Sequence, residues 1–132
     1  MSGSDRKIRL LIIDDETSIL ETLGILFRGE GDFEVHTEAR GEDAIRFIED
    51  EAPDIVLSDI RMPGTTGLDV LAAANAADPE LPVILMTAQA SLQSAMEAVN
   101  RGAYYYIQKP FQNEELVAIV RRAAEARELK QE

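Results

Sequence analysis

The sequence predicts an α/β protein in which five helices cover the two faces of a five-stranded parallel sheet. Short apolar segments alternate five times with amphipathic segments, which is typical of repeated βα units. The third apolar segment has three consecutive apolar residues, Ile55 to Leu57, as expected of a strand that is buried on both faces of a sheet. The chain has 132 residues, of which 45% are hydrophobic, and this suits a single domain with one core.

The expected strands are short apolar runs bounded by polar residues, glycine or proline. The third of them, residues 55–58, leads into Asp59 and then into the turn Met62-Pro63-Gly64. An acid at the carboxyl end of a buried strand lies where open α/β sheets bind ligands. The five expected strands are residues 8–13, 33–37, 55–58, 83–87 and 104–107.

The first two helices follow from apolar residues at helical spacing. We expect Thr17 or Ser18 to cap the first helix and Gly29 to end it. In the second helix the inward-facing apolar residues fall within 44–48, and Pro53 comes after its end.

The last three helices have clearer boundary signals. The third is expected from Gly67 to about Asn75, and the fourth over residues 91–101 with Gly102 as its C′ residue. The fifth is expected to have Asn113 as its cap. The apolar stripe of the fourth helix consists of Leu92, Met96 and Val99.

Composition and charge exclude several classes of function. The net charge of −12 argues against direct nucleic-acid binding and permits a cation or a basic partner. There are no cysteines, which excludes disulfides, thiolate metal sites and cysteine nucleophiles. The apolar runs are too short to span a membrane, and no signal-peptide core is visible, so a cytoplasmic protein is expected. Residues 1–6 are expected to be a disordered tail, and residues 125–132 a helix extension or the start of a linker.

Polar side chains gather at the carboxyl ends of four expected strands. In a parallel sheet these ends lie along one edge, so the side chains can converge there. The residues concerned are Asp14, Asp15, Glu16, Asp59, Thr87 and Lys109.

These groups predict a site for phosphoryl transfer. Clustered carboxylates repel unless a cation neutralises them, and Mg²⁺ prefers oxygen ligands. Zinc is not expected, because the only histidine, His36, lies on the second strand away from this edge. Lys109 and Thr87 supply a positive charge and a hydroxyl for phosphoryl oxygens. Asp59, alone on its central strand, is the best candidate for an attacking carboxylate.

Four motifs in this order resemble the receiver domain of bacterial two-component response regulators. They are Leu-Ile-Ile-Asp-Asp-Glu at 11–16, Asp-Ile-Arg-Met-Pro-Gly at 59–64, Met-Thr-Ala at 86–88 and Lys-Pro-Phe at 109–111. The resemblance covers about residues 7–124. It implies a doubly wound, flavodoxin-like fold with strand order 2-1-3-4-5.

The resemblance also implies the chemistry of the site. Asp59 would accept a phosphoryl group from the phosphohistidine of a sensor histidine kinase. Asp15, Asp59 and the backbone carbonyl of Arg61 would ligate Mg²⁺, and Asp14 would act mainly through a metal-bound water. Glu16 would cap the first helix or support the metal ligands.

Thr87 and Lys109 would then bind the phosphoryl oxygens, and the Lys109–Pro110 peptide bond would be cis. Thr87 and Tyr106 would form the switch that changes the surface of the fourth helix, fifth strand and fifth helix. Homodimerisation through this surface is the expected consequence of phosphorylation.

Residues that flank the site are expected to tune the rate of dephosphorylation; they are Arg61, Ala88 and Gln89. Thr65-Thr66 replaces the Met-Asp that is usual in the family, which affects the loop and the choice of partner. Within the family the chain most resembles receivers of the NtrC class, which control an ATPase that acts on sigma-54 polymerase. In that case the ATPase and DNA-binding domains would lie outside this chain.

Two other functions are compatible with parts of the pattern. One is a pseudo-receiver, a protein-interaction module that never carries phosphate; the complete set of acids, Thr87 and Lys109 argues against it. The other is a Mg²⁺-dependent phosphohydrolase with an aspartyl-phosphate intermediate. Such enzymes usually have an acid two residues after the nucleophile, and here that position is Arg61.

Overall fold

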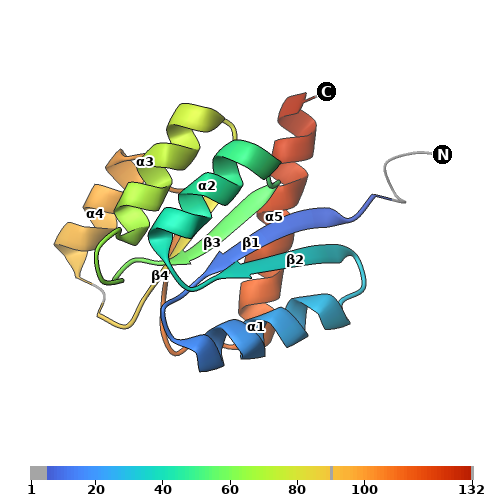
Figure 1. Ribbon diagram of the computed structural model, residues 1–132, viewed down its shortest axis with the longest axis horizontal. Helices are drawn as coiled ribbons and strands as arrows, with labels where there is room; N and C mark the ends of the chain where they lie inside the picture. The colour runs from blue at the N-terminus through green and yellow to red at the C-terminus, as the bar shows by residue number, and fades with distance from the viewer. Residues whose placement is uncertain (1–5, 90, 132) are drawn as a thin grey trace.

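The computed structural model describes residues 6–89 and 91–131, and it consists of a central parallel sheet between two layers of helices (Figure 1). All strand pairs are parallel, in the order β2-β1-β3-β4-β5, which confirms the predicted fold class. The elements are β1 Ile8–Ile13, α1 Thr17–Gly29, β2 Phe33–Glu38, α2 Gly41–Glu51, β3 Ile55–Asp59, α3 Gly67–Ala77, β4 Val83–Thr87, α4 Leu92–Asn100, β5 Tyr105–Gln108 and α5 Asn113–Gln131.

The two faces of the sheet have separate cores. Helices α1 and α5 cover one face, and α2, α3 and α4 cover the other (Figure 1). Along β1 the side chains alternate, so that Leu10 and Ile12 enter the first core while Leu11 and Ile13 enter the second. Burial of both faces explains why the inner strands β1, β3 and β4 are mainly apolar.

The predicted strands agree closely with the structure. β1 and β4 have the predicted bounds, and the other three strands differ by one residue at one or both ends. The helix caps were predicted less well. Of the residues expected to cap α1, Glu16 occupies the N-cap position, and Thr17 and Ser18 do not. The backbone N–H of Glu16 donates to the Asp14 carboxylate, 3.0 Å away, and this turns the chain at that point. Asn113 lies inside α5, whose first turn closes on the carbonyl of Gln112.

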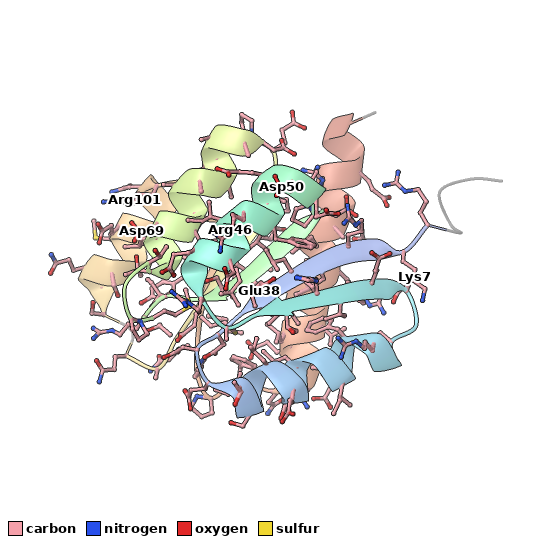
Figure 2. The ribbon with its side chains drawn as sticks, viewed as in Figure 1. Lys7, Glu38, Arg46, Asp50, Asp69 and Arg101 are labelled. Atoms are coloured by element: carbon pink, nitrogen blue, oxygen red, sulfur yellow. The ribbon has the colours of Figure 1, made fainter. Side chains whose placement is uncertain are left out.

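The apolar stripe of α4 faces solvent. Leu92, Met96 and Val99 are 78%, 55% and 65% exposed, whereas Ala98 is the buried residue of this helix. Ala98 is small enough to let α4 lie close to the sheet. The apolar side of α4, which the sequence pattern would place in the core, is therefore exposed to solvent. For comparison, charged residues such as Arg46 and Asp50 occupy the outer face of α2 (Figure 2).

The last turns of α5 remain in contact with the domain. The Arg127 side chain is only 10% exposed, and its Nη2 lies 2.9 Å from the Asp78 carboxylate at the end of α3. Its Nε lies 3.8 Å from Asp54, just before β3. α5 is thus held against the amino-terminal edge of the sheet as far as Arg127. The predicted tail at residues 1–6 falls outside the described residues, apart from Arg6.

The end of α2 provides a test of backbone strain. Ala52 is the C-cap and has the left-handed conformation, with φ of 50°. Replacement by glycine removes the clash of the Cβ, and we expect Ala52→Gly to raise the free energy of unfolding by about 0.5–1 kcal/mol. Urea denaturation measures it. The same change at the exposed Ala72 inside α3 should destabilise by about 1 kcal/mol. Equal effects of the two changes would contradict this account.

Candidate functional site

The acids predicted to converge lie together at the carboxyl edge of β1 and β3. These strands are neighbours, with Ile13 opposite Ser58, so Asp14 and Asp15 follow β1 beside the end of β3 at Asp59. Oxygen atoms of the three carboxylates lie within 4.8 Å of one another. Asp14 and Asp59 are buried and Asp15 is exposed. The cluster therefore has one side open to solvent and two acids held in the protein.

Lys109 brings a positive charge into the cluster from the end of β5. Its Nζ lies 2.9 Å from Asp14 Oδ2 and 3.6 Å from Asp59 Oδ1. Burial by itself lowers the pKa of the ammonium group, but the hydrogen bond to Asp14 and the attraction of Asp14 and Asp59 outweigh it, so the pKa is raised. Lys109 therefore stays protonated. Its backbone N–H donates to the Thr87 carbonyl at 2.7 Å, and its peptide bond to Pro110 is cis.

The surroundings of Asp59 raise the pKa of its carboxyl group. Burial and the negative charge of Asp14 raise its pKa from 3.8 to about 6, with a smaller contribution from Asp15 and with Lys109 opposing. One ammonium group thus leaves three carboxylates incompletely neutralised. Hard oxygen donors with excess negative charge fit a divalent cation such as Mg²⁺.

The loop between β3 and α3 is held by close contacts with two glycines. A Cβ on Gly67 would lie 2.4 Å from the carbonyl oxygen of Asp59, and one on Gly41 would lie 2.5 Å from that of Thr65. Thr66 caps α3 in a reciprocal capping box with Asp69, which gives the Thr65-Thr66 departure a local structural role. The exposed Arg61 lies in this braced loop, next to the site.

The remaining predicted residues lie at the end of β4, just after it, and on β5. Thr87 is buried at the end of β4, and its hydroxyl oxygen accepts a hydrogen bond from the Gln89 N–H at 3.1 Å. Ala88 and Gln89 are exposed beside it. Tyr106 on β5 is half-buried, and its hydroxyl lies 2.6 Å from that of Ser94 on α4.

Sequence reasoning missed Ser94, and it treated His36 as incidental. The signal for Ser94 was the Ser-x-x-Ser spacing with Ser91, since the two residues form a capping box. His36 stacks on Phe47 at 4.0 Å and is hydrogen-bonded to Glu38 at 2.6 Å, outside the acidic cluster.

Comparison with known families and proteins identifies this type of domain. Residues 10–121 match the model of the response regulator receiver domain, and the chain belongs to this family. Regulatory protein AtoC of Escherichia coli K12 is 41% identical over 124 residues, which are 94% of this chain and 27% of AtoC. The DNA-binding transcriptional regulator NtrC of the same organism is 40% identical over 112 residues, 85% of this chain and 24% of NtrC. The match to NtrC confirms the predicted subfamily resemblance. The chain spans about a quarter of the length of these relatives.

Solved structures agree with this assignment. A receiver domain protein (CheY-like) from Methanospirillum hungatei JF-1 superposes with a TM-score of 0.89 at 31% identity, over 96% of this chain and 99% of that one. NtrX from Brucella abortus, in complex with ADP, gives a TM-score of 0.87 at 32% identity, over 95% of this chain and 29% of that one. Within the described residues, none of the helices has the length and apolarity needed to cross a membrane.

The raised pKa of Asp59 predicts how stability depends on pH without added metal. The folded state retains a proton on Asp59 between its unfolded pKa of 3.8 and its folded pKa of about 6. Stability from this group is full below pH 3.8 and is lost as the pH rises through about 6. Asp59→Asn removes the charge, so at pH 8 it should raise the free energy of unfolding by about 1–3 kcal/mol.

Denaturation in EDTA at pH 4 and pH 8 measures this difference. The matched control is Asp50→Asn on the exposed face of α2, which should change stability by less than about 0.5 kcal/mol. A lower stability of Asp59→Asn at pH 8 would contradict the assigned electrostatic strain.

Proposed function

We propose that this domain is a phosphoacceptor switch in which Asp59 takes a phosphoryl group from the phosphohistidine of a sensor histidine kinase. The observation that carries the proposal is the convergence of three carboxylates and one partly buried ammonium group at the carboxyl edge of the sheet. Membership in the response regulator receiver family supports it. A cytoplasmic location agrees with this role.

Mg²⁺ is the proposed cofactor, and its function would be to neutralise the carboxylates and the phosphoryl oxygens. Asp15, Asp59 and the backbone carbonyl of Arg61 would hold it, with Asp14 acting through a bound water. The fit rests on the oxygen-only donors and on the raised pKa of Asp59, which reports excess negative charge. Bound metal would favour the ionised carboxylate that the reaction needs.

The transfer step requires an ionised Asp59 in line with the phosphorus atom. A carboxylate oxygen of Asp59 forms the new P–O bond as the P–N bond to the kinase histidine breaks, and the imidazole leaves with the bonding pair. The Lys109 ammonium and the Thr87 hydroxyl bind the phosphoryl oxygens, so charge and hydrogen bonds stabilise the transition state. The same residues would support slow autodephosphorylation, at a rate tuned by Arg61, Ala88 and Gln89.

The output would follow from movement of two hydroxyl-bearing residues, the buried Thr87 and the half-buried Tyr106. Thr87 would turn toward the phosphoryl group, and Tyr106 would move into the space that Thr87 leaves. The surface of α4, β5 and α5 would change and would control a partner or a further domain. By analogy with the NtrC class, we propose that this further domain is an ATPase linked to DNA binding. The proposal places it outside the present chain, because residues 10–121 match the receiver domain.

Phosphorylation by a small donor tests the assignment of Asp59. With acetyl phosphate and Mg²⁺, the wild-type protein should gain the mass of one phosphoryl group, because the site itself catalyses the transfer. Asp59→Asn should lose at least about 95% of this product, since the attacking oxygen is gone. Intact-protein mass spectrometry measures the product.

The control is again Asp50→Asn, which should be phosphorylated like the wild type. EDTA should suppress the reaction in both proteins. Phosphorylation of Asp59→Asn to the wild-type extent would refute the proposal. Failure of the wild type to bind Mg²⁺ at millimolar concentration would instead favour the pseudo-receiver, and multiple turnover of a phosphomonoester would favour the phosphohydrolase.

The exposed apolar residues of α4 support homodimerisation of the phosphorylated form. Leu92, Met96 and Val99 offer a continuous apolar contact surface on one side of the helix. With beryllofluoride and Mg²⁺ we expect a dimer in analytical ultracentrifugation, and Met96→Glu should weaken it by about tenfold or more. Arg46→Glu on α2 is the control and should leave the mass unchanged. Equal masses with and without beryllofluoride would count against this interface.

A further inference from the structure

One hydrogen bond joins the switch tyrosine to the beginning of α4. The Tyr106 hydroxyl on β5 lies 2.6 Å from the Ser94 hydroxyl in the first turn of α4. Ser94 is also part of the helix cap, because its N–H donates to Ser91 Oγ at 3.1 Å and its Oγ accepts from the Ser91 N–H at 3.2 Å. The Ser94 hydroxyl oxygen therefore contacts the Tyr106 hydroxyl and also takes part in the cap of α4.

This oxygen has more partners than a serine hydroxyl can satisfy at once. Ser94 Oγ has one hydrogen and two lone pairs, yet it lies within hydrogen-bonding distance of the Ser91 N–H, carbonyl and hydroxyl and of Tyr106. The contact with Tyr106 is the shortest of the four. The contact with Tyr106 is direct and does not pass through the Ser91 side chain, so it can persist when the cap is broken at Ser91.

The second hydroxyl of the switch is also occupied. Thr87 Oγ1 accepts a hydrogen bond from the Gln89 N–H at 3.1 Å. In the switch proposed above, Thr87 turns to the phosphoryl group and Tyr106 moves inward. In that switch, the contacts Thr87–Gln89 and Tyr106–Ser94 would belong to the resting arrangement, and each would have to break.

We propose that Ser94 is a positioning residue that holds Tyr106 in its resting position and so sets the bias of the switch. The inference rests on the proposed phosphoacceptor function and names the residue that opposes activation. When Tyr106 moves inward, Ser94 loses its partner on β5 and the first turn of α4 is no longer tied to the sheet edge. Leu92 lies in that turn, so the exposed apolar face of α4 changes at its beginning.

The matched pair Ser94→Ala and Ser91→Ala separates this role from capping alone. Both changes break the capping box, but only Ser94→Ala removes the partner of Tyr106. Alanine is a good helix former, so Ser94→Ala should leave the fold of α4 intact. Circular dichroism checks the helix content of both variants.

The first measurement needs neither phosphate nor metal. The chain has three tyrosines, and Tyr106→Phe assigns the Tyr106 ring in an aromatic NMR spectrum. The Tyr106 resonances should shift and broaden in Ser94→Ala and should stay near the wild-type position in Ser91→Ala. Unchanged Tyr106 resonances in Ser94→Ala would overturn the proposal.

The second measurement is the affinity for beryllofluoride with Mg²⁺. A bond made only in the resting state opposes activation, so its loss should tighten binding by about 2- to 10-fold in Ser94→Ala. Ser91→Ala should bind like the wild type. Equal or weaker binding by Ser94→Ala, or an equal gain in Ser91→Ala, would overturn the proposal.

The two proposals fail in different ways. A wild-type protein that does not bind beryllofluoride would overturn the assignment of Asp59. The ring measurement would still decide whether Ser94 positions Tyr106.

Discussion

Repulsion among the carboxylates at the carboxyl edge is the constraint on which the rest of the site depends. The parallel pairing of β1 with β3 forces Asp14 and Asp15 beside Asp59. Lys109 alone cannot neutralise them, and burial raises the cost of each charge, so the pKa of Asp59 rises to about 6. The backbone hydrogen bonds and the apolar cores of the sheet hold the three carboxylates close together against their mutual repulsion. A bound cation would relieve this repulsion, which is the role proposed above for Mg²⁺.

The same edge connects the site to the surface through a short chain of contacts. Thr87 ends β4, and the N–H of Lys109 on the neighbouring chain segment bonds to its carbonyl. Tyr106 on β5 reaches α4 through Ser94. In the proposed switch, a change of charge at Asp59 would reach α4 through Thr87 and Tyr106. The apolar residues of that helix are exposed because the small Ala98 is the residue that packs on the sheet.

The sequence predicted the sheet well because buried parallel strands have an unmistakable apolar pattern. It predicted that the acids and Lys109 would meet because the strand ends of a parallel sheet share one edge. It was less accurate at helix caps: Thr17 and Ser18 were expected as alternatives to Glu16 for α1, and Asn113 lies inside α5. The contact of Arg127 with Asp78 was also invisible, since the two residues meet only when α5 packs against the end of α3.

By itself, the sequence determined the fold class, the extents of the strands and the set of polar residues at the strand ends. These features depend on local patterns of polarity, which short segments carry. The tertiary structure decided which face of α4 is buried, how far the pKa of Asp59 is raised, and that the Ser94 hydroxyl contacts the Tyr106 hydroxyl. Those outcomes depend on distances of a few ångströms between side chains from different elements, and periodicity along the chain does not encode such distances.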